Sequence, residues 1–162
     1  RSRGRGDVYK RQPYDIYKIA EGEAEGDQEA ARRAFELCGE VAGDAFASAV
    51  TLTDSLIVIG GGLTGAAKYI KPALLKELRS AISTKGGEAV QRVQMRVFDL
   101  DDELEFAKFV VGDARPLKVY GTNDTVMYDP MKRTGIILSK LGASKAIAIG
   151  AYVFALKNLD AE

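Results

Sequence analysis

Apolar residues between Asp27 and Val50 recur three or four positions apart, which is the spacing of one face of an α-helix. Asp27 stands where a helix cap is needed, and Glu29 places negative charge in the first turn, where the helix dipole favours it. We therefore predict one long amphipathic helix over residues 27–50. The positions predicted to be buried are Ala31, Phe35, Cys38, Ala42, Ala45 and Ala49.

A continuous apolar run follows at residues 55–59, where the sequence reads Ser-Leu-Ile-Val-Ile. Such a run predicts a strand that is buried on both faces. It leads directly into three glycines at residues 60–62. Helical spacing then returns over residues 69–82, with Pro72 in or near the first turn, and the glycines at 86–87 end this helix.

The second half of the chain also alternates between strand and helix patterns. We predict a half-exposed strand at 91–100, a short helix at 103–111, two short strands at 115–120 and 125–128 around a turn, and a buried helix at 143–156. In that last helix, Gly150 and Ala151 would permit another element to approach closely. The mixture of elements indicates an α/β fold.

The first twelve residues are excluded from this interpretation. Asp7 to Gln12 is the translation of GAT GTG TAT AAG AGA CAG, the end sequence of a transposase-based sequencing adapter. We interpret residues 1–12 as an artefact of sequencing and expect the native sequence to begin near Pro13 and to continue upstream. The chain has 162 residues, which suits one domain with a sizeable core.

Removing residues 1–12 also changes the charge. That segment holds five of 23 basic residues and one of 23 acidic ones, so the remainder has 18 basic and 22 acidic residues and a net charge of −4. A basic N-terminal surface for nucleic acid or anionic lipid is thereby excluded. We find no apolar run of membrane-spanning length and no signal peptide, and we expect a soluble cytoplasmic protein.

The sequence also limits the possible chemistry. The chain contains no histidine, which excludes a histidine-based catalytic triad or metal site within it. Cys38 is the single cysteine, cannot form an internal disulfide, and is predicted to be a small buried apolar residue.

The three glycines at 60–62 are the strongest candidate for ligand binding. Glycine has no Cβ, so a ligand can lie against the backbone, and a following helix offers free N–H groups. The spacing fits neither the dinucleotide-binding fingerprint nor a P-loop. Local sequence alone leaves two readings open, a nucleotide-facing turn or a tight strand-to-helix connection without a ligand.

The order of segments over residues 20–158 resembles the C-terminal lobe of the ROK family, which comprises repressors, uncharacterised open reading frames and sugar kinases. The resemblance is greatest to its glucokinase-type members. The resemblance rests on the Gly26-Asp27 helix start, on Ile57-Val58-Ile59-Gly60-Gly61-Gly62-Leu63-Thr64, and on the segment from Ser139 to Ala151. It implies an incomplete actin-like ATPase fold, ribonuclease H-like, with residues 13–162 forming the C-terminal nucleotide-binding lobe.

By this resemblance, five residues match the adenosine-contacting turn, namely Gly60, Gly61, Gly62, Leu63 and Thr64. The stretch around Gly150 and Ala151 matches a helix near the hinge between the lobes, although ordinary core packing is the simpler reading. Lys140 and Lys145 could face phosphate, but lysines in such positions are usually solvated.

Several features of the family are absent from the chain. The family's catalytic aspartate, its Asp-x-Gly-x-Thr phosphate loop and its histidine-cysteine zinc site have no counterpart, so we assign no catalytic residue and no metal ligand. The acidic residues at 99–103 are interpreted as a solvated helix start, and Asp113, Asp124 and Asp129 as turn residues. The region of residues 111–134 is longer than in the usual core of the family, and we assign it no function.

The resulting hypothesis is a hexose kinase that uses ATP with Mg²⁺, most similar to glucokinase, of which this chain is an inactive nucleotide-binding part. Its expected partners are ATP, a hexose, which we expect to be glucose, and further copies of itself. We expect no membrane partner. Two alternatives remain: a ROK-type repressor, which would add nucleic acid as a partner, and a non-enzymatic actin-like module. A Rossmann-type cofactor site is less favoured because the second glycine spacing and the later acidic partner are not evident.

Overall fold

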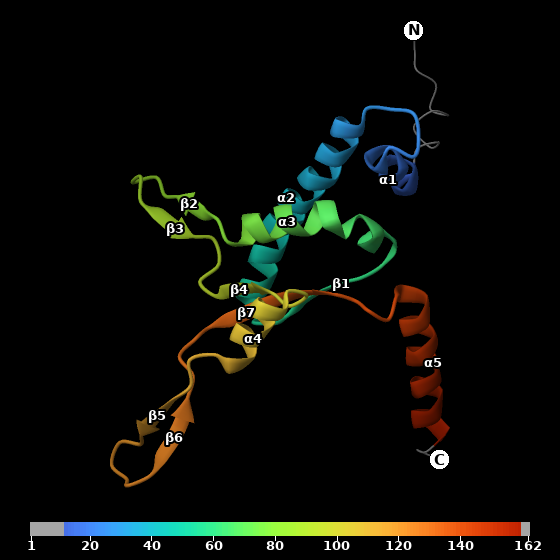
Figure 1. The fold of residues 1–162 in the computed structure, drawn as a ribbon. Helices are drawn as coiled ribbons and strands as arrows, with labels where there is room; N and C mark the ends of the chain where they lie inside the picture. Colours follow the sequence, from blue (N-terminus) through green and yellow to red (C-terminus); the bar gives the residue numbers. More distant parts are fainter. Residues whose placement is uncertain (1–11, 160–162) are drawn as a thin grey trace. The chain divides into compact units, whose positions relative to one another are not determined.

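The computed structural model describes residues 12–159, and the fold is mixed α/β (Figure 1). It divides into two compact units. The first comprises the residues up to Leu52 together with Gly65–Val93, and the second comprises Thr53–Thr64 together with the residues from Gln94 onward. The assignment of residues 1–11 to an adapter lies outside the described residues.

The first unit is built from three helices and a hairpin. Helix α1 begins after Gln12, whose backbone N–H donates to Asp15 Oδ2 at 3.0 Å. Helix α2 begins after Asp27, whose Oδ1 accepts the N–H of Ala30 at 2.9 Å, which confirms the predicted cap. The elements are α1 (Pro13–Glu21), α2 (Gln28–Thr53), α3 (Ala67–Leu78), β2 (Ala81–Ser83) and β3 (Ala89–Gln91).

The packed face of α2 differs from the predicted face beyond its second turn. Ala31 and Phe35 are buried as predicted, but Cys38 is exposed. The buried face continues instead through Gly39, Gly43, Ala47 and Val50. A Cβ on Gly39 would lie 2.3 Å from the carbonyl oxygen of Ile70 in α3, so glycine is what allows the two helices to touch.

Two predictions about the segment after α2 also need correction. Residues 79–82 do not extend α3, because Ile82 lies in β2 and pairs with Val90 of β3 in an antiparallel hairpin. Pro72 lies inside α3, just after its first turn. The glycines at 86–87 form the hairpin turn, with Gly87 at φ 84°.

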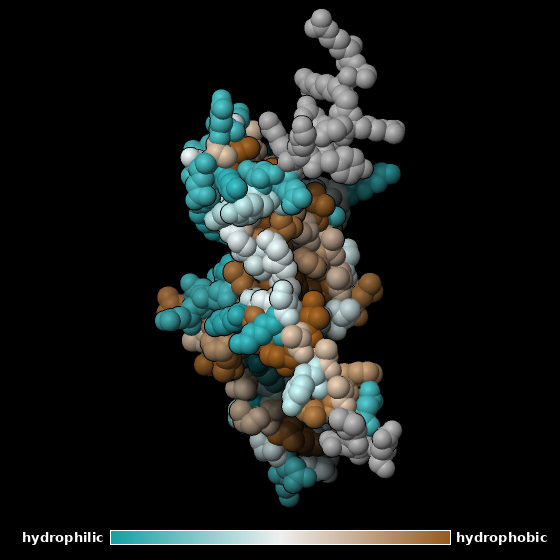
Figure 2. Space-filling view, turned by 90° about the vertical axis from the view of Figure 1, so that its right-hand side faces the viewer, coloured by the Kyte–Doolittle hydropathy of each residue, from teal (hydrophilic) through white to brown (hydrophobic). Residues whose placement is uncertain are grey.

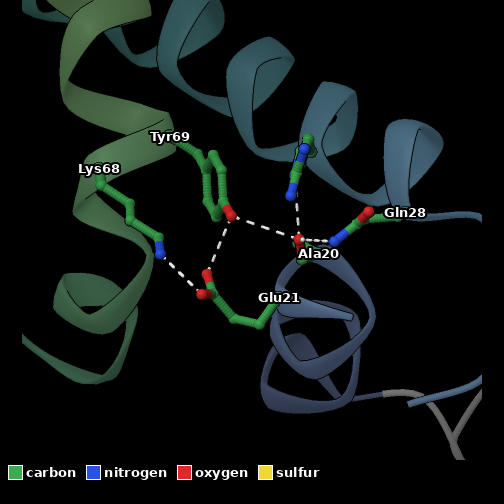
Figure 3. Close-up of polar contacts among 6 residues, drawn as sticks. Ala20, Glu21, Gln28, Lys68 and Tyr69 are labelled. Carbon is green, nitrogen blue, oxygen red and sulfur yellow. Dashed lines mark hydrogen bonds and ion pairs between the residues drawn. The ribbon is translucent and has the colours of Figure 1, made fainter. Parts of the chain in front are cut away.

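The first unit is held together by one apolar cluster and one polar network. The cluster consists of Ile19, Ala20, Ala31, Phe35, Ala66 and Ile70. In the network, the carbonyl oxygen of Ala20 at the end of α1 accepts hydrogen bonds from Gln28 Nε2 and Arg32 Nε, at 3.1 and 3.0 Å (Figure 3). The Tyr69 hydroxyl lies 3.3 Å from the same oxygen and donates its proton to Glu21 Oε1 at 2.9 Å. The two donors from α2 satisfy a helix-end carbonyl that has no partner within α1.

The second unit contains a parallel three-stranded sheet in the order β1-β7-β4. Its strands are β1 (Ile57–Ile59), β4 (Arg96–Asp99) and β7 (Arg133–Leu138). The central strand β7 was not predicted, and of the predicted strand at 91–100 only β4 and the last residue of β3, Gln91, are strand residues. At the centre, Ile136 is fully buried and the Thr134 hydroxyl donates to the Ser55 carbonyl oxygen at 2.8 Å.

The position of β1 at the edge of this sheet changes one prediction. We expected the strand to be buried on both faces, yet Ile57 is buried while Val58 is 63% exposed. Within the described residues, β1 pairs only with β7, and no described element covers the face that carries Val58.

The remaining elements of the second unit follow the predicted pattern more closely. Helix α4 (Glu103–Val111) has the predicted bounds, and β5 (Arg115–Lys118) and β6 (Thr125–Tyr128) form an antiparallel hairpin.

Helix α5 (Ala143–Leu159) is present, but its described side chains are exposed, including Tyr152 and Phe154 at 66% and 68%. Figure 2 shows apolar side chains reaching the surface on the face that it displays. The prediction of a buried helix is therefore wrong for this chain, and a Cβ on Gly150 would meet no atom within 4 Å.

Among the described residues, no helix is both long enough and apolar enough to cross a bilayer.

Candidate functional site

The candidate site lies at the carboxyl end of the parallel sheet in the second unit. All three strands run in the same direction, so the segments that follow them emerge at the same edge. These segments begin with Gly60 after β1, Ser139 after β7 and Leu100 after β4. Ligands of open α/β sheets bind at the carboxyl ends of the strands, which makes this edge the place to look for a binding site.

The glycine turn after β1 has a defined conformation. Gly61 has φ 94°, a left-handed value that residues with a Cβ rarely adopt. The Thr64 hydroxyl donates to the carbonyl oxygen of Gly61 at 2.8 Å, and the Thr64 N–H donates to the same oxygen at 3.2 Å. Thr64 therefore closes the turn. The chain continues into a short 3₁₀ helix, η1 (Gly62–Ala66), and not directly into the predicted α-helix.

The surface of this turn is open. A Cβ placed on Gly61 or on Gly62 would meet no atom within 4 Å, so no described part of the protein uses the space that these glycines leave. Leu63 is 42% exposed beside them. Free backbone and an exposed apolar side chain together suit a planar, partly apolar ligand such as a nucleoside.

The turn is fixed to the neighbouring strand β7. The Ser139 N–H donates to the carbonyl oxygen of Ile59 at 2.8 Å, and a Cβ on Gly60 would lie 3.5 Å from the Cβ of Ser139. Sequence reasoning missed this contact because it did not predict β7. The apolar run Ile136 to Leu138 was the available signal, and the turn residues before it obscured that signal.

The acidic segment after β4 is bound to the same edge. Asp102 caps α4 by accepting the N–H of Glu105 at 2.8 Å, which confirms the predicted helix start. Asp101 has a second role that was not predicted, because its Oδ2 accepts the N–H of Leu138 at 3.0 Å. The described residues contain no group of three or more acidic or cysteine side chains that could hold a metal ion.

The other candidate residues make no described contact with the glycine turn. Lys140 follows β7 and is exposed, and Lys145 in α5 is exposed as well. Asp129 holds a turn, as predicted: its Oδ1 accepts the N–H of Met131 at 2.9 Å, and its Oδ2 lies 2.7 Å from Arg133 Nη1. The backbone hydrogen bond from Met131 lowers the pKa of Asp129, and the charge of Arg133 contributes to the same shift.

Comparison with known proteins shows which solved structure the chain resembles. No protein-family model matches the chain, and no curated protein matches it. The structure superposes on the crystal structure of the glucokinase from Parabacteroides distasonis with a TM-score of 0.76 and 54% sequence identity. The match covers 94% of this chain and 41% of that chain. The chain is related to a bacterial glucokinase.

The match confirms the α/β fold class and is consistent with part of an actin-like ATPase lobe. The chain spans about two fifths of the length of that glucokinase. The match to this glucokinase does not test the five residues predicted for the nucleotide turn, and their role remains a prediction.

Proposed function

We propose that this chain is the nucleotide-binding part of an ATP-dependent hexose kinase of the ROK family, with glucose as the acceptor. The observation that carries the proposal is the 54% identity to a bacterial glucokinase over nearly the whole chain. The whole protein would transfer the γ-phosphate of ATP, accompanied by Mg²⁺, to a sugar hydroxyl. A cytoplasmic homo-oligomer is part of the same proposal.

The glycine turn supplies the nucleotide contacts in this proposal. The open backbone of Gly61 and Gly62 accommodates a ligand at van der Waals distance, and Leu63 offers an apolar surface to the base. Thr64 acts indirectly, because its hydroxyl is already bonded to Gly61. Phosphoryl transfer depends mainly on positioning and charge stabilisation, so the contribution of this part is to hold the nucleotide in a fixed place.

The chain by itself is proposed to be inactive. A sugar hydroxyl needs a base that orients or deprotonates it, and the ROK resemblance places that base in an N-terminal lobe with no counterpart here. In the whole protein, Mg²⁺ would be bound to the phosphates of the nucleotide.

A chimera tests this function directly. In the Parabacteroides distasonis glucokinase, the matched segment is replaced by this chain, and glucose-dependent ADP formation is measured. We expect activity from the chimera and none from the chain alone. In the same chimera, Gly61→Val should raise the KM for ATP by about tenfold or more with little change in the KM for glucose, because strain at a left-handed position distorts the turn.

A matched control is Gly86→Ala in the β2–β3 hairpin, because Gly86 lies outside the left-handed region and a Cβ there makes only an ordinary contact with the Thr84 hydroxyl. It should leave the KM for ATP nearly unchanged. A folded but inactive chimera would contradict the proposed kinase function. Equal effects of Gly61→Val on ATP and glucose would contradict the assignment of the turn to the nucleotide.

A further inference from the structure

A pocket of about 400 Å³ lies at the β4 side of the second unit, and the proposed function does not use it. Its walls come from β4, from the second half of α4 and from the segments that follow α4 and β6. This volume falls within the range of small-molecule sites, about 300 to 1,000 Å³. The lining residues are Arg96, Phe98, Ala107, Lys108, Val111, Gly112 and Met131.

The walls of the pocket are tied together. The rings of Phe98 and Phe109 pack edge to face with centroids 5.7 Å apart, which joins β4 to α4. The Arg133 guanidinium lies 5.4 Å from the centroid of the Phe109 ring. Arg133 pairs with Asp129, and Asp129 accepts the N–H of Met131, so the segment that brings Met131 to the pocket is held in place.

Two cations line this mainly apolar pocket, and their interactions differ from those of the neighbouring charged groups. Among the described residues, neither Arg96 nor Lys108 has an ion pair or a side-chain hydrogen bond, and both are exposed. By contrast, Arg133 is paired with Asp129, and Glu105 accepts the N–H of Asp99 at 2.6 Å. Two unpaired positive charges beside an apolar wall are complementary to an anion that carries an apolar group.

We propose that this pocket binds a small organic anion, a ring or short aliphatic chain that bears one phosphate or carboxylate. The anionic group would lie between Arg96 and Lys108, and the apolar group against Phe98, Val111 and Met131. The strand order separates the pocket from the glycine turn, because β4 and β1 are opposite edges of the sheet, roughly 10 Å apart. The proposal does not depend on the kinase function.

Phenyl phosphate is a suitable probe because it combines a ring with a dianion. It is titrated into the ¹⁵N-labelled chain, and the backbone amide shifts of Lys108, Val111 and Gly112 are followed. We expect saturable shifts at these amides. The double variant Arg96→Gln/Lys108→Gln should weaken binding by about tenfold or more, since each cation is expected to form a charge-assisted contact.

The control variant Arg115→Gln/Lys118→Gln removes two exposed cations of the β5–β6 hairpin and should bind as the unmodified chain does. Inorganic phosphate and phenol test the two halves of the ligand separately, and each should bind about tenfold more weakly than phenyl phosphate. The titrations with inorganic phosphate and with phenol use the unmodified chain, so they do not depend on whether a variant folds.

Three results would overturn the proposal. The first is the absence of saturation at about 10 mM phenyl phosphate. The second is equal affinity in the Arg96→Gln/Lys108→Gln variant, provided that its amide spectrum retains the dispersion of the folded chain. The third is equal binding of inorganic phosphate, which would show that the apolar wall contributes nothing.

Discussion

The backbone N–H of Leu138 donates a hydrogen bond to Asp101 Oδ2 at 3.0 Å, which joins the end of β7 to the loop after β4. The next residue, Ser139, donates its N–H to the carbonyl oxygen of Ile59 at the end of β1. The loop that carries Asp101 is itself braced, because the Asp101 N–H donates to Asp99 Oδ1. Asp101 therefore helps to fix the strand end against which the glycine turn is placed.

Asp101→Ala should loosen this edge without unfolding the second unit. One hydrogen bond to Leu138 is lost, and we expect a decrease of about 1 kcal/mol in the free energy of unfolding. Amide exchange at Leu138 should become faster. Asp101→Asn keeps an oxygen acceptor and should have a smaller effect. Glu103→Ala, at an exposed carboxylate in the first turn of α4, is the control. Unchanged exchange at Leu138 in Asp101→Ala would show that this bond does not restrain the strand end.

Gly61→Ala should destabilise the turn although space is available for the methyl group. The cost is conformational, because φ 94° is unfavourable for a residue with a Cβ, and we expect about 1 to 2 kcal/mol. Gly62→Ala is the matched control, since a Cβ there also meets no atom and its φ lies outside the left-handed region. Chemical denaturation of both variants measures the difference. Equal stability of the two variants would argue against strain at Gly61.

Gly39→Ala tests the contact between α2 and α3. The added Cβ would lie 2.3 Å from the Ile70 carbonyl oxygen and 3.0 Å from the Cβ of Ala73, and backbone cannot move aside cheaply. We expect a loss of about 1 to 3 kcal/mol in the free energy of unfolding. Gly150→Ala in exposed α5 is the control, and it should be neutral or stabilising by about 0.5 to 1 kcal/mol. A neutral Gly39→Ala would mean that the helices do not pack this closely.

This glycine contact explains how far α2 could be predicted from the sequence. Hydrophobic periodicity placed the helix and its cap correctly because both depend on local chemistry. It failed to place the buried face beyond Phe35, because Gly39 and Gly43 carry no hydrophobic signal. They are buried because α3 approaches the backbone of α2, and that information resides in another element. For the same reason Cys38, which looked apolar and internal, is exposed.

The parallel sheet shows what local sequence signals could not predict. The strand before the glycines and the turn itself were predicted, since a β-branched run and three glycines are local signals. Strand β7 was not, although it is the central strand and contributes Leu138 and Ser139 to the candidate site. Its pairing depends on residues that are distant in the sequence. The predicted burial of α5 also depends on a partner, and no described residue of this chain supplies one.

The Glu21–Lys68 pair predicts how the stability of the first unit depends on pH. Lys68 Nζ lies 2.7 Å from Glu21 Oε2, and the Tyr69 hydroxyl donates to Glu21 Oε1 at 2.9 Å (Figure 3). The hydrogen bond from Lys68 is the main cause that lowers the pKa of Glu21 below its ordinary value of 4.5, and burial opposes it. A carboxyl group with a lowered pKa in the folded state favours folding when it is ionised.

The stabilisation from Glu21 should be complete above pH 4.5 and should be lost as the pH falls through the lowered pKa of the folded state. Urea unfolding followed between pH 2 and pH 7 measures this dependence. Glu21→Gln retains an acceptor for Tyr69 but removes the charge, so its stability should change less with pH over the acid range. Glu25→Gln, at an exposed carboxylate in the loop after α1, should preserve the dependence of the unmodified chain. If Glu21→Gln and Glu25→Gln behaved alike, the pair with Lys68 would not contribute to stability in acid.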